Sequence, residues 1–210
     1  MKLFKALMAA LLVVACAAPA SAQVYESKSY IKKTSKTTTI DNSYKNYSRI
    51  GLYYNNMSWW SDYGDESLNG LDIQYVYGIN LTKRYPMYLE VGGAFKFGVG
   101  GDDGEDWQDF MIEVPVNYTY RFFFNNRKIA ISPFVGLNFN IHLSTTANFN
   151  GNDWDAFEDL DGRRFQMGWK IGSNFDFRKF YIGLSYGTDF WGVLEDSGSG
   201  TFNLGLGFVF

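Results

Sequence analysis

The chain has 210 residues, of which 46% are hydrophobic, 19% aromatic and 20% charged, and 22 are glycine. This length fits one domain, and the mixture of aromatic residues and glycines is typical of many short strands rather than of helices. The formal net charge of −3 argues against nucleic acid as a partner, because no basic excess is available to meet phosphates.

The first stretch, residues 1–22, is predicted to be a secretory signal peptide. Lys2 and Lys5 precede an apolar run at 7–14, and small residues lead up to the cleavage site. A lipobox-like alternative ends at Cys16, but the better peptidase site removes this sole cysteine, so we expect no disulfide or thiol chemistry. The mature chain keeps 17 of the 19 basic residues and all 22 acidic ones, a net charge of −5.

Residues 23–47 are rich in Ser, Thr and Lys without a sustained apolar period, and they are expected to form a basic periplasmic tail. The remainder, 48–210, is expected to be the folded domain. No stretch in it reaches the roughly 20 apolar residues of a membrane helix. If this domain enters a membrane, it must do so as a closed barrel, because only a barrel satisfies every backbone group of its strands there.

The domain repeats one pattern, in which apolar side chains occupy every second position of eight stretches. None of those positions carries an Asp, Glu, Lys or Arg, and a charge there would cost roughly 2–4 kcal/mol near the middle of a bilayer. The positions between them are polar or glycine and suit the interior of a small barrel. The eight stretches are 50–54, 71–81, 87–99, 110–120, 131–143, 165–177, 180–190 and 202–210.

The connections alternate in length and in charge. Four long ones contain 15 acidic residues and no Lys or Arg, and they are 59–69, 101–109, 144–162 and 191–200. Three short ones contain six basic residues and no acid, and they are 82–86, 122–128 and 178–179. Long loops at one end and short turns at the other are typical of outer-membrane barrels. The expected fold is therefore all-β, an eight-stranded antiparallel up-and-down transmembrane β-barrel.

The chain ends on "FNLGLGFVF", with apolar residues at alternate positions up to the last one. This ending resembles the signal by which the outer-membrane barrel assembly machinery recognises its substrates, and the residues that carry it are Phe202, Leu204, Leu206, Phe208 and Phe210. The region 48–210 as a whole resembles the small eight-stranded outer-membrane barrels of the OmpA transmembrane domain and OmpX kind. The resemblance implies the outer membrane as location, with its lipids and lipopolysaccharide as surroundings.

An eight-stranded barrel is just wide enough for its own side chains to fill it, so inward charges need partners. If the third and fourth strands turn near residue 105, opposed residues have numbers that total about 210. Two cross-strand or diagonal ion pairs are then predicted, Lys96 with Glu113 and Glu90 with Arg121. Lys170 and Asp176 are expected to extend this network. The pairs either fill the lumen or, as the resemblance implies, exchange partners to open a narrow water path.

Two prolines lie inside the expected strands. Pro115 and Pro133 each remove a hydrogen bond from the sheet, so we expect a bulge or a strand end near each of them.

The acidic loops offer no specific metal site. The best alignment to the twelve-residue calcium pattern places Gly151 at the turn and Phe157 where a bidentate Glu is needed, so no metal or cofactor is expected. His142 and Ser144 have the H-x-S spacing of outer-membrane lipid A deacylases, and Glu158 could complete a triad. Strand parity disfavours that site, because Leu143 rather than the histidine is expected to face lipid.

The sequence thus predicts a non-enzymatic outer-membrane barrel with a structural or adhesive role, acting through its acidic aromatic loops or its basic tail. A narrow passive channel is the first alternative. A soluble lipid-binding barrel, with its apolar face inside and its charged face outside, is the second.

Overall fold

The computed structural model describes residues 44–61, 64–101, 105–125, 127–149, 152–159, 162–193 and 197–210. The predicted signal peptide at 1–22 lies outside the described residues, as does the predicted tail at 23–47 apart from its last four residues. The unit described below is Tyr44–Val209.

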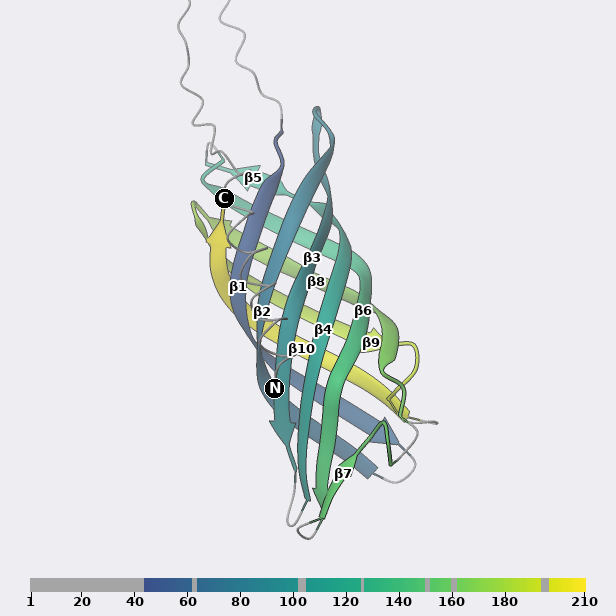
Figure 1. The fold of residues 1–210 in the computed structure, drawn as a ribbon. Helices are drawn as coiled ribbons and strands as arrows, with labels where there is room; N and C mark the ends of the chain where they lie inside the picture. The colour runs from purple at the N-terminus through teal and green to yellow at the C-terminus, as the bar shows by residue number, and fades with distance from the viewer. Residues whose placement is uncertain are drawn as a thin grey trace, which may run out of the picture. The chain divides into compact units, whose positions relative to one another are not determined.

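These residues fold into a closed antiparallel barrel, in which β1 pairs with β2 on one side and with β10 on the other (Figure 1). Within the described part of the chain the strands are β1 (Tyr47–Ser61), β2 (Gly64–Thr82), β3 (Tyr85–Gly100), β4 (Glu105–Tyr120), β5 (Phe122–Phe124), β6 (Ile129–Phe149), β7 (Asn152–Asp155), β8 (Phe165–Phe177), β9 (Phe180–Asp189) and β10 (Ser197–Val209). Short β5 continues the line of β4 along β6, and short β7 pairs with the far end of β6. The other eight form the wall, so the predicted eight-stranded barrel is confirmed.

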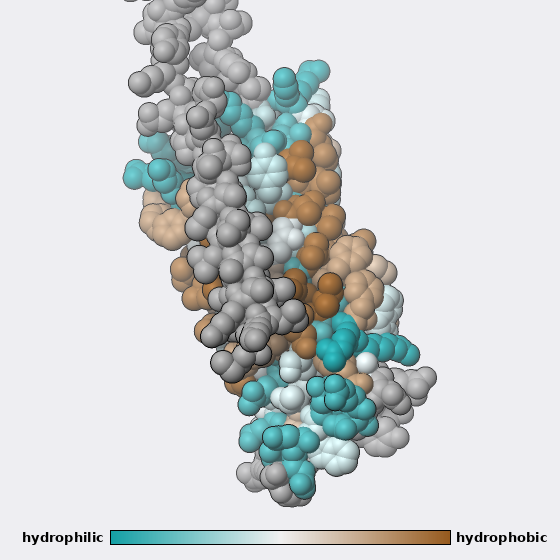
Figure 2. All heavy atoms as spheres, in the orientation of Figure 1, coloured by the Kyte–Doolittle hydropathy of each residue, from teal (hydrophilic) through white to brown (hydrophobic). Residues whose placement is uncertain are grey.

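The outward face of the wall is apolar and the inward face is polar. Leu71, Ile73 and Leu206 are 55%, 60% and 67% exposed, whereas Lys96 is 2% and Glu113 is 0% exposed. Hydrophobic side chains cross the middle of the visible face in Figure 2, with hydrophilic ones toward both ends. This arrangement is the reverse of the one that a soluble lipid-binding barrel requires, so that alternative is wrong.

The wall strands are longer at one end than the sequence pattern predicts. β2 has 19 residues and β6 has 21, although about 9–11 residues suffice for a tilted strand to cross a bilayer. Much of each expected acidic loop is therefore strand, and the loop boundaries at 59–69, 101–109, 144–162 and 191–200 are corrected. We call this the loop end, where β7 lies in Figure 1, and the opposite one, with the short basic turns, the turn end.

The apolar side of the last strand is exposed along its length. The five side chains concerned are Phe202, Leu204, Leu206, Phe208 and Phe210. The described residues contain no helix that is long and apolar enough to cross a membrane.

A strand end is present near Pro133, but in the neighbouring strand, because β6 itself runs unbroken through the proline. Phe134 of β6 pairs with Thr119 of β4 and Ile131 pairs with Phe122 of β5, so the interruption between β4 and β5 lies across from the proline. The break suits a residue that cannot donate a ladder hydrogen bond.

Pro115 behaves differently, because it lies inside β4 and neither a strand end nor a bulge occurs at it. On either side of the proline, β4 pairs with β3 in the same register, as Val91 with Val116 and Ala94 with Glu113 show. Only the two positions of each strand between these pairs are unpaired. A register shift does occur in β4, but at Phe110 and Met111, which lie opposite Ser144 and His142 and leave Leu143 as the extra residue.

Candidate functional site

The barrel interior is the most distinctive site among the described residues, because charged or amide side chains from seven of the eight wall strands, and the Ser185 hydroxyl from β9, are buried in it. A buried ion without a partner is costly, so the pairing of these groups determines what the interior can do. Between the turn end and the loop end the buried groups form three layers.

The layer nearest the turn end is an ion cluster of four residues, of which three come from different strands and Arg121 lies between β4 and β5. Arg49 Nη1 lies 2.6 Å from Glu90 Oε1, and Arg49 Nη2 lies 3.0 Å from Asp176 Oδ2. Arg121 Nη2 lies 2.7 Å from the same Asp176 oxygen. Two cations and two anions thus balance one another, and Arg49 links β1 to β3 and β8 across the lumen.

Tyrosines surround this cluster. Tyr47 donates a hydrogen bond to Glu90, and its ring lies 4.0 Å from the guanidinium carbon of Arg121. The Tyr88 ring meets the Tyr47 ring edge to face at 4.9 Å. Cation–π contact and aromatic packing therefore add to the ion pairs and fill the lumen at this level.

The segment that precedes β1 closes the turn end further. The Tyr44 amide donates to the Lys83 carbonyl at 3.2 Å, and the Tyr44 ring stacks on Phe123 at 5.6 Å. Arg127 lies over the Tyr44 ring, with its guanidinium carbon 4.6 Å from the centroid. Contacts from the β2–β3 turn and from β5 thus meet at one aromatic residue.

The central layer is a carboxylate between two lysines. Lys96 Nζ lies 2.6 Å from Glu113 Oε2, and Lys170 bonds to the other oxygen of Glu113. Asp72 is directly opposite Lys96 in the β2–β3 register and is 3% exposed, yet its Oδ1 has no hydrogen-bond partner within the described part of the chain. The layer is neutral in sum, and Lys96 has a second carboxylate as its cross-strand neighbour.

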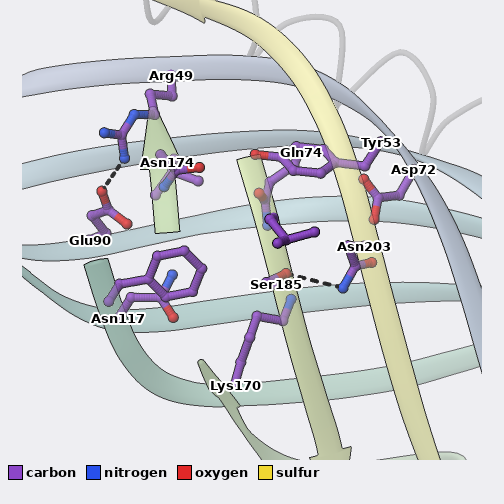
Figure 3. Close-up of a pocket in the computed structure, with 13 residues that line it drawn as sticks. Arg49, Tyr53, Asp72, Gln74, Glu90, Asn117, Lys170, Asn174, Ser185 and Asn203 are labelled. Atoms are coloured by element: carbon purple, nitrogen blue, oxygen red, sulfur yellow. Dashed lines mark hydrogen bonds and ion pairs between the residues drawn. The ribbon is translucent and has the colours of Figure 1, made fainter. Parts of the chain in front are cut away.

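A cavity of about 20 Å³ lies beside the central layer (Figure 3). Its lining includes Asp72, Lys170, Asn117 and Asn203, and the side-chain oxygens of both asparagines also lack a partner among the described residues. A polar cavity of this volume holds about one water molecule. At this level the described interior is therefore occupied by paired and hydrogen-bonded side chains, and this cavity has room for about one water molecule.

The layer nearest the loop end is centred on His142. Its Nδ1 lies 2.8 Å from Asp109 Oδ1, and its Nε2 lies 2.6 Å from Gln166 Oε1. Thr145 also donates to Asp109, at 2.6 Å. The Gln166 amide nitrogen donates to the Trp191 carbonyl, which fixes the orientation of the amide and leaves its oxygen facing the histidine. Both ring nitrogens therefore face acceptors, as in a doubly protonated imidazolium paired with Asp109.

An apolar cluster covers this layer. Its buried members come from β1, β2, β4 and β6, with Trp59 packed against them, and they are Met57, Leu68, Trp107, Met111 and Ala147. The lumen is thus sealed by apolar side chains at the loop end and by tyrosines at the turn end.

The structure brings together one of the two predicted ion pairs. Lys96 and Glu113 are in contact on a diagonal, but Glu90 contacts Arg49 and Arg121 contacts Asp176, so the predicted Glu90–Arg121 pair is wrong. The cause is the register, because opposed residues of β3 and β4 have numbers that total 207, as Ala94 with Glu113 shows, and not about 210. Glu90 is therefore opposite Asn117.

Lys170 and Asp176 do extend the interior network, as the sequence suggests, but they join different layers. Lys170 contacts Glu113 in the centre, and Asp176 contacts Arg49 and Arg121 at the turn end.

Sequence reasoning missed Arg49 and Asp109. Both were detectable by parity, because Arg49 alternates with the outward Ile50 and Leu52, and Asp109 precedes the outward Phe110. The sequence pattern places Asp109 in an acidic loop, whereas the structure places it inside β4, 0% exposed and bonded to His142.

The H-x-S site does not form a triad. His142 is 1% exposed, and both of its ring nitrogens are engaged by Asp109 and Gln166, so neither is directed to Ser144. Glu158 is exposed.

No protein-family model matches the chain, and no curated protein matches it. The fold is similar to that of the crystal structure of Ail, the attachment invasion locus protein of Yersinia pestis, with a TM-score of 0.54 and 19% identity over 80% of this chain and 100% of that one. Ail in complex with the heparin analogue sucrose octasulfate gives a TM-score of 0.52 at 18% identity, with the same coverage. Neisserial surface protein A gives 0.53 at 13% identity, over 78% of this chain and 96% of that one.

Proposed function

We propose that this chain, an eight-stranded β-barrel, is an outer-membrane protein with a surface-binding or adhesive role, which acts through its acidic extracellular loops. The loop end is then extracellular and the turn end is periplasmic. The single observation that carries the proposal is the charge-paired lumen, in which the described cavity beside the central ion pair has only about 20 Å³, too little for a solute larger than water. Function is therefore assigned to the ends of the barrel rather than to its interior.

The extracellular end has the side chains that such a role needs. Exposed carboxylates and tryptophans lie on strands that extend beyond the expected membrane region, and the described ones include Asp106, Asp153, Trp60 and Trp154, while Glu158 is exposed in the turn after β7. Regular strands hold the first four of these groups in place, so less conformational entropy is lost on binding than with a flexible loop.

The charge of this end selects the class of partner. Ail was crystallised with a heparin analogue, which is a polyanion. The four stretches at this end, 59–69, 101–109, 144–162 and 191–200, contain 15 acids and no Lys or Arg, and of these acids Asp109 is buried inside the barrel. The next basic residues are Arg163 and Arg164. Repulsion disfavours a polyanion here, so the proposed partner presents cationic groups, either directly or through divalent ions shared with lipopolysaccharide.

The test is retention of the barrel, embedded in zwitterionic nanodiscs, on immobilised polylysine at low and high salt. The wild type is expected to bind at low salt only. Combined Asp106→Asn, Asp153→Asn and Glu158→Gln changes should weaken binding about tenfold, at roughly 0.5 kcal/mol for each exposed charge contact. Because the amides keep the shape of the carboxylates, a fold defect is not expected.

The matched control is Arg163→Gln with Arg164→Gln, which should strengthen retention because it removes positive charge from the same end. Equal retention of the wild type and both variants, or no retention at all, would contradict the proposed role.

A second candidate function, a narrow gated channel, is favoured by one observation. Lys96 contacts Glu113 but is directly opposite Asp72, whose Oδ1 is unpartnered within the described residues. Transfer of the Lys96 ammonium from Glu113 to Asp72 would open a water path beside Lys170. Conductance recordings of the barrel in a planar bilayer distinguish this candidate from the surface-binding role.

The proposal also includes the outer-membrane barrel assembly machinery as a partner. It would recognise the exposed apolar side of β10 and the residue after it, through Phe202, Leu204, Leu206, Phe208 and Phe210.

A further inference from the structure

The turn end carries a concentration of positive charge that the proposed function does not use. Three turns between wall strands each present two adjacent basic residues, all of them exposed, and no acid lies in any of these turns. The six residues are Lys83, Arg84, Arg127, Lys128, Arg178 and Lys179.

Two of these turns are directly bonded to each other. The Arg178 amide donates to the Lys128 carbonyl at 2.7 Å, so the β5–β6 turn and the β8–β9 turn lie side by side. The Lys179 carbonyl accepts a hydrogen bond from the Val209 amide at 2.7 Å. Arg127, Lys128, Arg178 and Lys179 therefore form one patch, which we call the basic patch, on neighbouring turns.

The backbone at both arginines of the basic patch is strained. Arg127 has φ of 65° and Arg178 has φ of 56°, a region that residues with side chains rarely adopt. Arg178 is the first of only two residues between the paired Phe177 and Phe180, and glycine usually occupies such a position in a hairpin turn. An arginine at a site that favours glycine points to a function for its side chain.

The guanidinium groups lie beside aromatic rings of the barrel rim. The guanidinium carbon of Arg178 is 5.5 Å from the Phe177 ring centroid, and that of Arg84 is 5.6 Å from the Tyr85 ring centroid. Phe177 and Tyr85 are each 50% exposed on the outside of the barrel. Exposed aromatic rings at the end of a membrane barrel lie at the level of the lipid headgroups, so the adjacent cations reach the same level.

We propose that the basic patch, together with Arg84, is a binding site for anionic phospholipid headgroups of the periplasmic leaflet. The planar guanidinium donates two parallel hydrogen bonds to a phosphate, which suits it to this ligand. The rim rings favour lipid over an anionic cell-wall polymer, because they hold the cations at the bilayer surface rather than farther out in the periplasm.

The test compares spin-labelled phosphatidylglycerol with spin-labelled phosphatidylcholine, each at trace level in phosphatidylcholine vesicles that contain the refolded barrel. The measured quantity is the ratio of motionally restricted label for the two lipids. We expect a preference of at least about twofold for phosphatidylglycerol, since one cation near an anionic surface contributes roughly fivefold. The preference should disappear in 1 M salt, where the Debye length is about 3 Å.

Combined Arg84→Gln, Arg127→Gln and Arg178→Gln changes should bring the ratio to about one. Arg163→Gln with Arg164→Gln is the matched control, because it removes arginines at the opposite end, where Arg164 also lies over an aromatic ring, at 4.2 Å from Phe157. The control should keep the wild-type ratio. A wild-type ratio of one, or equal loss in both variants, would overturn the proposal.

Arg178→Gly separates function from folding. Glycine relieves the positive φ, so this variant should resist unfolding in urea at least as well as the wild type while its lipid preference falls. An unchanged preference would overturn the role of Arg178. Binding of soluble anionic cell-wall fragments by the barrel in detergent, without any phosphatidylglycerol preference in vesicles, would identify the cell wall as the partner and overturn the lipid assignment.

Discussion

Arg49 shows how single residues stabilise the interior of this barrel. Its guanidinium is 2% exposed and contacts both Glu90 and Asp176, so three strands depend on one side chain. Burial of such groups is costly, and it is tolerated because each layer is neutral in sum. The central layer follows the same rule, with Lys96 and Lys170 balanced by Glu113 and Asp72 in the same interior.

Glu113→Gln is expected to destabilise the barrel by about 3–5 kcal/mol, the usual cost of leaving a buried charge without its partner. The variant leaves Lys96 and Lys170 beside a neutral amide. Unfolding of the refolded protein by urea in lipid vesicles, followed by tryptophan fluorescence, measures the change in free energy.

The control for that measurement is Glu158→Gln, the same substitution at an exposed site, which should stay within about 0.5 kcal/mol of the wild type. Adding Lys96→Met to Glu113→Gln restores a neutral layer of Lys170 and Asp72, and should recover at least half of the lost stability. A single variant as stable as the wild type would show that the charge balance of the layer is unimportant.

At the scale of the strands, parity was readable from the sequence and register was not. Alternation alone shows that Lys96 and Glu113 point inward, because each strand has one apolar face. The contact between them is predicted correctly because both lie in one hairpin. Whether the numbers of opposed residues total about 210, as predicted, or 207, as observed, the two residues are directly opposite or diagonal neighbours. The contacts of Arg49 with Glu90 and Asp176 cross the lumen between distant strands, and no local pattern encodes them.

The ends of the strands could not be predicted from the sequence either, for a physical reason. Beyond the expected membrane region a strand loses the apolar alternation that a lipid face imposes, although its backbone continues to pair, as β1 and β2 do up to the pair Ser61 and Gly64. Acidic residues there resemble a loop in sequence. The bulge opposite Phe110 and Met111 is not predicted either. The extra residue, Leu143, changes which alternate residues face inward only for the part of β6 that follows it.

Gly92→Ala and Gly93→Ala in β3 form a matched pair that tests the close approach of neighbouring strands. A Cβ at Gly92 would lie 2.0 Å from the Tyr75 carbonyl oxygen, whereas a Cβ at Gly93 meets nothing within 4 Å. Gly92→Ala should therefore cost about 1–3 kcal/mol, because backbone has to move. Gly93→Ala should be neutral or stabilise by about 0.4–1 kcal/mol, through lower entropy of the unfolded chain.

Urea unfolding in vesicles again provides the measurement for this pair. Equal effects of the two substitutions would contradict the packing described for the inward side of β3.

In the described barrel, paired charges occupy the middle of the lumen and a cluster of apolar or aromatic side chains closes it toward each end, while the exposed charges are mainly acidic at the loop end and basic at the turn end. Tyr47 and Tyr88 pack around the cluster at the turn end, and Met57, Leu68 and Trp107 cover the loop end. An ion that crosses the lumen has to pass the tyrosines, the central layer and the apolar cluster. Opening the central layer alone is therefore not sufficient for conduction. The clusters at both ends of the lumen therefore favour the binding role over the channel role.

Planar-bilayer recordings of the refolded barrel are therefore expected to show no reproducible conductance steps, and the same holds for Glu113→Gln and for Lys96→Met. Each of these changes alters only the central ion pair and leaves both seals in place. A further variant, Trp107→Ala with Met57→Ala, removes side chains that close the loop end, while the tyrosines still close the turn end. This variant should therefore also show no conductance steps. Steps in the wild type that change with Glu113→Gln would instead mean that Lys96 exchanges partners within a conducting lumen, and transport would replace surface binding as the function of this barrel.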